Sequence, residues 1–451
     1  MKKTLIAVIV VVLLVVGAGL LVRLAGVRVP GLHRQPPYRA GETQPPAPPF
    51  DRLEFVMAYR GLTGEEGDLQ YNSYWGFGGD RNASNSFIEA VRAVATNTTP
   101  VYNPRFKGAE YAMIEHEGQK VKALYFDLNA DGKLTDSEKI TSFRKSPGNP
   151  AAVDFFTPDF QMETDDGRKV MFRGMLQVAF YGSEDHLNCM WSPACVLEGR
   201  SEVDKQPVTM VLYANGFTGE FDGFGRCSYS LLAGKRVTGR YVSRQTLSKI
   251  ISHHGRFYRV RLDRDEATGH VAKVVIEEDT TPTGTLKMRL AAKSDTNARL
   301  NNATLKGRDD EGIHFSISGN QNISALPAGD YVVSSGYICY GPDDENWNVS
   351  FTNGPQIAVE PNKTVDLEIG EPKMAVVAID AAQRYSGQAE DKTVFAKGTT
   401  VYLSPKVTGK AGETYGRFGR VVKNNYTQVK PVVEIHDAAG KPLVSQTLEY
   451  G

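Results

Sequence analysis

The chain has 451 residues, of which 41% are hydrophobic and 23% are charged, and its formal net charge is zero. This length allows two to four domains with proper hydrophobic cores. Residues 1–50 carry six basic residues and one acidic residue, so the remainder holds 46 basic and 51 acidic residues. A slightly acidic body argues against a nucleic-acid partner.

The amino terminus contains a nearly unbroken apolar run from Leu5 to Val22, preceded by Lys2 and Lys3. A helix of this length, at about 1.5 Å per residue, spans a bilayer core. We expect a transmembrane signal-anchor at 5–24 after a short cytoplasmic tail at 1–4, the alternative being a cleaved signal peptide. Basic residues on both sides of the run leave its orientation open. The short leading tail and the contents of the large domain favour a single-pass protein with its bulk outside the cytoplasm.

Residues 25–50 are rich in proline, with Pro36-Pro37 followed by a second cluster from Pro45 to Pro49. Proline fixes φ and favours the extended polyproline II conformation. We therefore expect a semi-rigid linker that holds the body of the protein away from the membrane.

The body begins with a predicted α+β domain at 51–150. Phe55–Tyr59 has the composition of a strand, and Ser86–Thr96 has a capping box and the apolar spacing of a short helix. Tyr111–Phe126 follows with a strand–turn–strand pattern around Gly118.

Directly after this hairpin, twelve residues have the spacing of a calcium-binding loop. Oxygen-bearing side chains stand at loop positions 1, 3, 5, 9 and 12, and a glycine stands at position 6, where the chain turns sharply. Calcium prefers about six to eight oxygen ligands in a flexible geometry, and this spacing wraps them around one ion. The expected ligands are five side chains and one backbone carbonyl, those of Asp127, Asn129, Asp131, Thr135 and Glu138 and that of Lys133.

The twelve residues resemble the calcium loop of EF-hand and dockerin modules at every liganding position. The resemblance implies Ca²⁺ as the cofactor, with one oxygen each from Asp127, Asn129 and Asp131. It also implies that Thr135 acts through a water or its hydroxyl, and that Glu138 closes the shell with both oxygens.

The flanks of the loop differ from that family. The hairpin Tyr111–Phe126 stands where an EF-hand has its entering helix. After the loop, a capping box of Thr135 and Glu138 favours a short helix through Phe143, and a strand is the alternative. Because a sensor opens a packed helix pair, the pattern favours a structural ion over a switch.

Residues 151–283 are predicted to form a β-rich domain with a degenerate second hairpin. When Gly219 is aligned with Gly132, the strand Val208–Tyr213 matches Val121–Phe126 before the predicted calcium loop. Phe221 then takes the place of Leu134, the apolar anchor at loop position 8. The three ligands before the glycine then fall on residues without carboxylates, namely Ala214, Gly216 and Thr218. This match suggests an internal repeat whose second loop has no metal.

The same domain carries a second predicted helix, Ser243–His253, which ends before Gly255. The pair His253-His254 is interpreted as a surface pair at the helix end, because no third metal ligand stands nearby. A hairpin around the turn Asp263–His270 is expected next.

The carboxyl-terminal part has short alternating strands at sandwich spacing. Leu326–Val333 is similar to a strand of carboxypeptidase-regulatory-like and related prealbumin-type sandwiches, which implies a β-sandwich at 284–371. The strand pattern of 372–451 resembles an immunoglobulin-like module. The expected fold class is therefore mainly β with a few short helices, in which an N-terminal transmembrane helix is followed by several β-sandwich-like domains.

The four cysteines, Cys189, Cys195, Cys227 and Cys339, allow three pairings. Cys189 and Cys195 flank a compact loop suited to a local disulfide, which would leave Cys227 and Cys339 to pair across domains. An oxidising compartment would permit such bridges, and the alternative is four buried free thiols.

The sequence contains no GxSxG elbow, P-loop, HExxH or GxGxxG after a strand, so we expect no enzyme. The expected function is that of a membrane-tethered extracytoplasmic protein whose calcium loop stabilises a β scaffold for binding or cell-envelope organisation. Its expected partners are the membrane, through the N-terminal helix, and a cell-surface glycan or protein. The alternatives are a calcium sensor and a surface hydrolase on glycan or peptide substrates, with carboxylates near Tyr74 and Trp75 or near Trp347.

Overall fold

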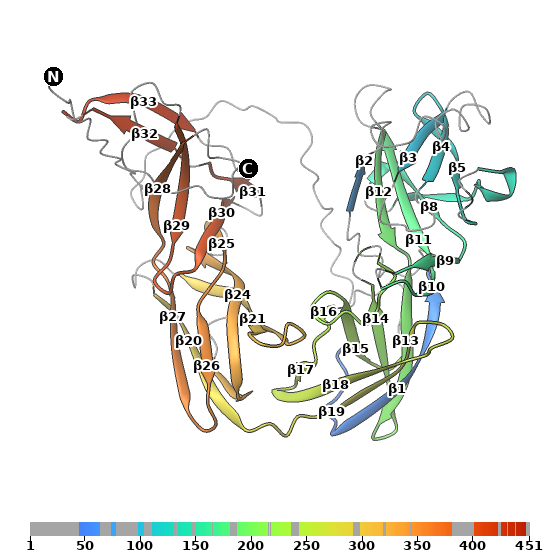
Figure 1. Ribbon diagram of the computed structural model, residues 1–451, viewed down its shortest axis with the longest axis horizontal. Helices are drawn as coiled ribbons and strands as arrows, with labels where there is room; N and C mark the ends of the chain where they lie inside the picture. Colours follow the sequence, from blue (N-terminus) through green and yellow to red (C-terminus); the bar gives the residue numbers. More distant parts are fainter. Residues whose placement is uncertain are drawn as a thin grey trace. The chain divides into compact units, whose positions relative to one another are not determined.

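The structure is a computed structural model (Figure 1). It describes residues 45–447 except for the segments 64–73, 78–97, 103–110, 130, 132–133, 147–148, 165, 181–186, 215, 217, 236–242, 292–297, 319–321, 343–344, 381–400, 423–424, 431 and 438. The chain divides between Asp279 and Thr280 into two compact units. We call their described parts the N-terminal unit (45–279) and the C-terminal unit (280–447).

The described residues are mainly β, as predicted, and they form several sheets. Helical structure among them is limited to the 3-10 turn η2 (Asp136–Glu138). The predicted tail 1–4, anchor 5–24, most of the linker 25–50 and the helix Ser86–Thr96 lie outside the described residues. In the part of the chain that is described, no helix is long and apolar enough to cross a membrane.

The N-terminal unit is built on an antiparallel sheet of eight strands in the order β16-β15-β14-β13-β1-β19-β18-β17. The first strand of the body lies at its centre, paired with β13 on one side and β19 on the other. The strands are β1 (Arg52–Gly61), β13 (Cys195–Val203), β14 (Gln206–Tyr213), β15 (Ser228–Ala233), β16 (Gln245–Thr246), β17 (Ile250–His253), β18 (Arg256–Arg264) and β19 (Val271–Glu278).

Three smaller sheets complete this unit, in the orders β2-β12-β11-β8-β7, β3-β4-β5-β6 and β9-β10. The predicted hairpin over Tyr111–Phe126 is present as β4 and β5. The strands are β2 (Tyr74–Phe77), β3 (Thr98–Tyr102), β4 (Tyr111–Glu117), β5 (Lys120–Phe126), β6 (Lys139–Ile140), β7 (Phe143–Ser146), β8 (Asn149–Phe156), β9 (Phe160–Glu163), β10 (Lys169–Phe172), β11 (Gly174–Phe180) and β12 (Leu187–Pro193).

One hydrophobic core joins these sheets. Phe126, the last residue of β5, lies with its ring centroid 5.5 Å from Trp191 on β12 and 5.1 Å from Phe160 on β9. Phe126 and Trp191 are each 1% exposed. Burial of such large rings contributes about 1.5–3 kcal/mol each. The strand that leads into the predicted calcium loop is therefore fixed by the core.

The prediction of a helix over Ser243–His253 is wrong. This segment forms the two short strands β16 and β17, and β17 pairs with β18 through Ile250↔Arg259 and Ile251↔Tyr258. Both isoleucines are buried, as the helical spacing required, but they are β-branched residues that pack well in a strand. His254 and Gly255 have positive φ values of 48° and 77°, which is the geometry of a tight hairpin turn.

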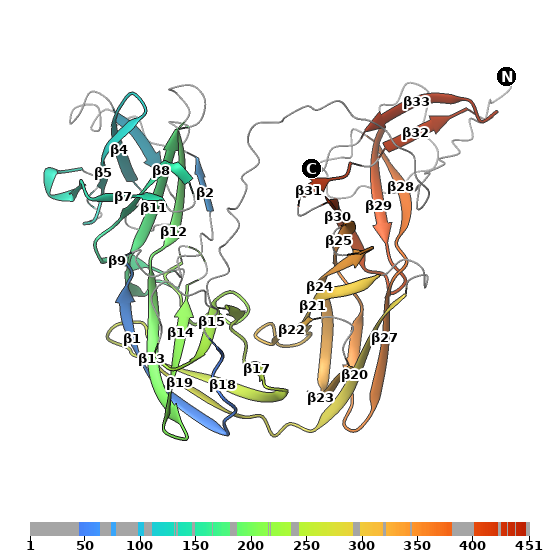
Figure 2. The same ribbon diagram turned by 180° about the vertical axis from the view of Figure 1, so that it is seen from behind.

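The C-terminal unit contains a nine-stranded sheet with the main order β22-β21-β24-β25-β30-β29-β28, on which β26 pairs with β24 and β31 with β30 (Figure 2). This sheet continues across the predicted domain boundary at 371/372. Its strands are β21 (Arg299–Gly307), β22 (His314–Ser318), β24 (Gly329–Tyr340), β25 (Glu345–Thr352), β26 (Gln356–Val359), β28 (Lys373–Asp380), β29 (Val401–Thr408), β30 (Thr414–Val422) and β31 (Asn425–Gln428).

A three-stranded sheet, β23-β20-β27, and the hairpin β32-β33 complete the C-terminal unit. Strands β20 and β27 run parallel, whereas β23 runs antiparallel to β20. The strands are β20 (Thr283–Ala291), β23 (Asn322–Pro327), β27 (Thr364–Gly370), β32 (Val432–His436) and β33 (Pro442–Thr447).

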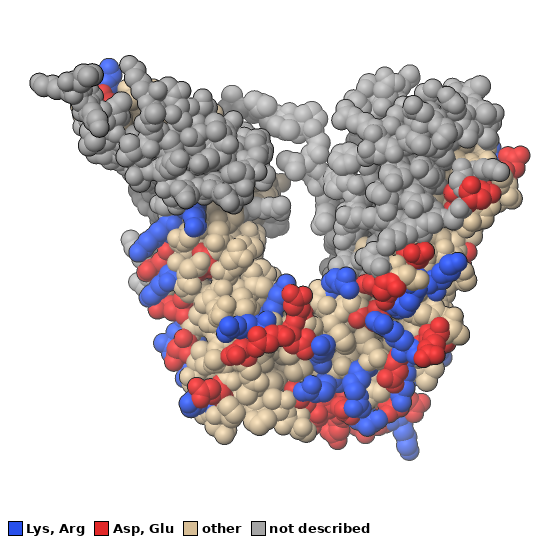
Figure 3. All heavy atoms as spheres, viewed as in Figure 1, with Lys and Arg blue, Asp and Glu red and all other residues tan. Residues whose placement is uncertain are grey.

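Charges of opposite sign are interspersed on the face of the molecule seen in Figure 3. On the eight-stranded sheet, Lys273 lies 2.7 Å from Glu54, and Arg261 lies 3.2 Å from Glu277. Exposed pairs of this kind contribute little to stability, because water and salt screen them. On this sheet they set charges of opposite sign side by side, so neither sign dominates there.

Candidate metal centre

The predicted calcium loop is closed at its base by β-sheet pairing. Leu124 pairs with Ile140 and Tyr125 with Lys139, so the strands that enter and leave the loop lie side by side. A tight turn at Gly118, whose φ is 54°, joins the entering strand β5 to β4, and the two strands pair along one edge. The two ends of the twelve-residue loop are thus held together by the backbone.

Glu138, at loop position 12, reaches back across this base. Its Oε1 accepts the backbone N–H of Leu128 at 3.0 Å, and its Oε2 accepts the N–H of Thr135 at 2.9 Å and the Thr135 hydroxyl at 2.9 Å. The residue is 5% exposed. The predicted capping box is present, but it encloses only the single turn η2 before β6 starts at Lys139, so the expected strand forms and the helix through Phe143 does not.

The first three predicted ligands lie at the other side of the loop. Asp127 is 2% exposed, and its Oδ1 accepts the backbone N–H of Asp131 at 3.2 Å. Oδ1 of Asn129 accepts the same N–H at 2.9 Å. These bonds turn the chain back on itself over five residues, as Asx side chains commonly do. Lys133 and the glycine before it lie outside the described residues.

The apolar anchor of the loop is buried where the sequence places it. Leu134 is 8% exposed and packs in a small core with Met113, Ala123 and Tyr125, which come from β4 and β5. This contact ties the middle of the loop to the hairpin below it. The loop is therefore held at its base, at its middle and through Glu138.

The donor set fits calcium chemically. Its side chains offer carboxylate, amide and hydroxyl oxygens, which are hard ligands, and no thiol or imidazole. Glu138 is a buried carboxylate whose contacts within the described structure are backbone N–H groups and a hydroxyl, and a cation would compensate its charge. Among the described residues, no three His, Cys, Asp or Glu side chains lie together as a metal cluster, so the structure does not gather the Asp127, Asp131 and Glu138 carboxylates around one point.

The loop after β14 follows the same strand order as the predicted calcium loop. Strands β13, β14 and β15 form a meander, as β4, β5 and β6 do, and the loop lies between the second and third strands. Gly219 has a φ of 68°, and Phe221, the residue aligned with Leu134, is 2% exposed. The two hairpins thus share a strand order, and the internal repeat stays a prediction.

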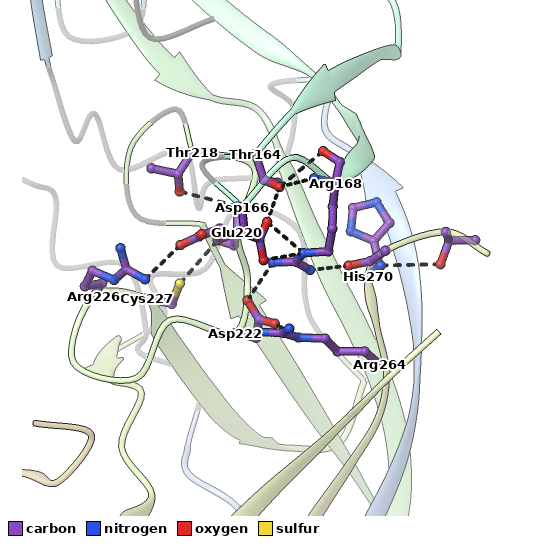
Figure 4. Close-up of polar contacts among 12 residues, drawn as sticks. Thr164, Asp166, Arg168, Thr218, Glu220, Asp222, Arg226, Cys227, Arg264 and His270 are labelled. Atoms are coloured by element: carbon purple, nitrogen blue, oxygen red, sulfur yellow. Dashed lines mark hydrogen bonds and ion pairs between the residues drawn. The ribbon is translucent and has the colours of Figure 1, made fainter. Parts of the chain in front are cut away.

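In this second loop, guanidinium groups contact the carboxylates (Figure 4). Asp222 lies between Arg168, whose Nη2 is 3.7 Å from its Oδ1, and Arg264, which donates to its Oδ2. Glu220 forms an ion pair of 3.1 Å with Arg226. The sequence pattern did not indicate this network, because its arginines are far apart in the chain. Arg168 lies in the turn before β10, Arg264 ends β18, and Arg226 lies in the loop itself.

Arg168 links three segments that are distant in the sequence. Its Nε donates to both carboxylate oxygens of Asp166, at 2.9 and 2.7 Å, and its Nη1 donates to the carbonyl of Gly269 at 2.6 Å. Hydrogen bonds from Thr164 and Arg168 hold the pKa of Asp166 below its usual value. The loop that lacks calcium ligands is thus fastened by charge-assisted hydrogen bonds.

His270 is buried beside this network. It stacks on Tyr59 at 5.6 Å and meets the edge of Phe221 at 5.6 Å, and neither ring nitrogen has a hydrogen-bond partner within normal distance and angle. Burial lowers the pKa of His270, the Met171 backbone opposes this shift, and the smaller effects of Arg168 (lowering) and of Asp222 and Asp265 (raising) follow.

We expect acid to destabilise the N-terminal unit through His270. Because its folded-state pKa is lowered, the unfolded chain binds more protons, so stability falls as the pH drops below about 6.5. Melts at pH 7.5, 6.5 and 5.5 measure this slope. His270→Phe keeps the ring contacts and is expected to flatten the slope, while His436→Gln in the C-terminal unit serves as the control. An unchanged slope in His270→Phe contradicts the assignment.

The remaining predicted residues are distributed over both units. All four cysteines are described, and each is a buried free thiol, including Cys189 and Cys195. Burial raises the pKa of both of these thiols to about 12. Tyr74 and Trp75 form part of β2, and Trp347 on β25 is 42% exposed.

Comparison with protein-family models, with curated proteins and with solved structures finds no match to this chain.

Proposed function

We propose that the chain is a membrane-tethered extracytoplasmic protein in which one Ca²⁺, bound at Asp127–Glu138, stabilises a β scaffold used for binding or cell-envelope organisation. The observation that carries the calcium proposal is the position of Glu138. Its buried carboxylate spans the loop to the N–H of Leu128 and so stands next to the first ligand, Asp127.

A structural role for the ion is favoured by what surrounds the loop. Both flanks are strands of one sheet, and Phe126, immediately before Asp127, is fixed in the main core. No packed helix pair is present in the described part of the chain. An ion here would neutralise the carboxylates of the loop and hold the hairpin, with Asp127, Asn129, Asp131, the Lys133 carbonyl, Thr135 and Glu138 as the ligands.

The tether is supported by the sequence before the body. The apolar run Leu5–Val22 has the length of a bilayer span, and a proline-rich segment separates it from the first strand. Protease added to intact cells tests the orientation. Cleavage of the body without lysis is the expected result, and protection of the body until lysis contradicts the extracytoplasmic assignment.

Calcium is expected to raise the melting temperature of the N-terminal unit. At a free calcium concentration about 100 times Kd, binding contributes about 2.7 kcal/mol, which corresponds to roughly 5–10 °C for a unit of this size. The measurement is a thermal melt of the full-length chain in detergent, with calcium and then with chelator, and with magnesium as the control ion. Identical melts with calcium and with chelator contradict the proposal.

A further inference from the structure

The last residues of the predicted linker are packed against the N-terminal unit. We call Pro45–Phe50 the strap. Its backbone continues the edge of β15: the N–H of Ala47 donates to Leu231 O at 3.2 Å, and the N–H of Ala233 donates to Pro45 O at 3.1 Å. Ala47 is fully buried and Phe50 is 6% exposed. The strap thereby covers a stretch of sheet edge that β16 leaves uncovered.

Two adjacent histidines hold the strap through one atom. Nε2 of His253 lies 3.0 Å from the carbonyl oxygen of Ala47, and Nε2 of His254 lies 2.8 Å from the same oxygen. A carbonyl oxygen only accepts hydrogen bonds, so both rings must carry their proton on Nε2. Their ring centroids are 4.4 Å apart. The hairpin turn at His254 and Gly255 creates this pairing, because it places two consecutive side chains over the strap.

The surroundings of the two rings are mixed in charge. Phe50 and Tyr258 pack on His253, with ring centroids 5.3 and 6.3 Å away, and the Tyr258 hydroxyl donates to Phe50 O at 2.7 Å. From β18, Arg256 adds a positive charge that is shared with Asp51 at 3.3 Å and Glu278 at 3.7 Å. Both rings share the neutral Ala47 carbonyl as an acceptor, and the Pro48 backbone also acts on His253.

We propose that His253 and His254 form an acid-sensitive latch that holds the strap at neutral pH and releases it when both rings are protonated. Each neutral ring donates Nε2–H to Ala47 O. On acidification each ring takes one proton from water on Nδ1 and becomes a cation. Two cations then stand side by side near Arg256, against a carbonyl that brings no compensating charge.

The geometry makes the second protonation the decisive step. A single imidazolium still donates to Ala47 O and strengthens that bond, because the donor is then charged. The second charge adds repulsion between neighbouring rings and favours a state in which they separate. Burial and the neighbouring His254 ring lower the pKa of His253, and they outweigh the Pro48 and Ala47 backbone groups, which raise it.

Release of the strap has two consequences. It uncovers the edge of β15 at Leu231–Ala233, which then offers unpaired backbone groups to another strand. It also adds six residues to the free length between the body and the proposed membrane anchor. This second consequence depends on the proposed tether, whereas the latch itself depends only on the contacts of the strap.

Amide hydrogen exchange of the full-length chain at pH 7.5 and pH 5.5, corrected for the intrinsic effect of pH on exchange, tests the latch. At pH 5.5 the protection of the Ala47 and Ala233 amides is expected to fall at least about tenfold more than that of Val211 in β14, which reports the acid destabilisation of the whole unit. Equal protection of the strap amides at both pH values overturns the proposal. This readout requires neither calcium nor a membrane, so its failure is distinguishable from failure of the proposed function.

The matched variant is His253→Gln with His254→Gln. Glutamine retains an N–H donor but does not titrate, so the strap amides are expected to keep their protection at pH 5.5. A double variant that still loses protection only at pH 5.5 overturns the latch. If the double variant loses the strap at both pH values, the single variant His253→Gln is the test. Protonated His254 then has no charged ring beside it, so the loss of strap protection at pH 5.5 is expected to disappear. His436→Gln, in the other unit, is expected to respond like the unmodified chain.

Discussion

Glu138→Gln is expected to abolish most of the rise in melting temperature that calcium produces. The amide keeps one oxygen but replaces the other with an NH₂ group, so the side chain no longer offers two anionic oxygens to the ion. If the affinity falls about 100-fold, the stabilisation at the same calcium concentration drops from about 2.7 to about 0.4 kcal/mol. Melts with calcium and with chelator give both values.

The same substitution has a second, metal-independent effect. The NH₂ group donates and cannot accept from Thr135, whose N–H and hydroxyl both contact Oε2 in the folded chain. The free energy of unfolding measured in chelator is therefore expected to fall by about 1–3 kcal/mol. Asp136→Asn is the matched control. Asp136 is exposed and stands two residues away, and its substitution removes the same charge from a position that is not a predicted ligand. A full calcium response in Glu138→Gln means that Glu138 only caps the turn.

Glu413→Ala is expected to give the largest loss of stability in the C-terminal unit. Glu413 is completely buried, and its carboxylate accepts three donors: Gly370 N–H at 2.7 Å, Tyr415 O–H at 2.8 Å and Ala411 N–H at 3.0 Å. The carboxylate thus joins the end of β27 to the turn between β29 and β30. Alanine leaves all three donors without an acceptor, and we expect a loss of roughly 3–5 kcal/mol.

Two further variants separate the charge from the hydrogen bonds. Glu413→Gln retains the oxygen that serves Gly370 and Tyr415 and loses only the acceptor for Ala411, so about half of the loss is expected. Glu368→Gln is the control, because Glu368 forms an exposed pair with Lys410 that contributes little to stability. Denaturant unfolding of the full-length chain measures all three. A loss below 1 kcal/mol for Glu413→Ala contradicts this account.

Some features of the chain could be predicted from the sequence because they depend on residues that are close together in the chain. The alternation of apolar residues predicted the strands, including the hairpin of β4 and β5 and that of β18 and β19. The spacing of Asp127–Glu138 specified a turn with oxygen donors at fixed offsets, and the structure places Asp127, Leu134 and Glu138 inside it. Each of these patterns depends only on neighbours within about twelve residues.

The segment Ser243–His253 shows where local pattern is insufficient. Its apolar residues satisfy a helical period and are buried as expected, but buried residues in a short segment fit a helix and an irregular strand pair equally well. Pairing with β18 and the turn at Gly255 decided between them. The available backbone partner, which lies outside the segment, set the outcome.

By itself, the sequence determined the β periodicity, the calcium-loop spacing, the apolar run and the proline-rich linker. Only the tertiary structure placed β1 between β13 and β19, gathered Arg168 and Arg264 on Asp222, and set His253 and His254 against Ala47. The reason is that these contacts join residues far apart in the chain. Their hydrogen bonds and ion pairs form only after the core has fixed the strands, and no local spacing encodes which strands will meet.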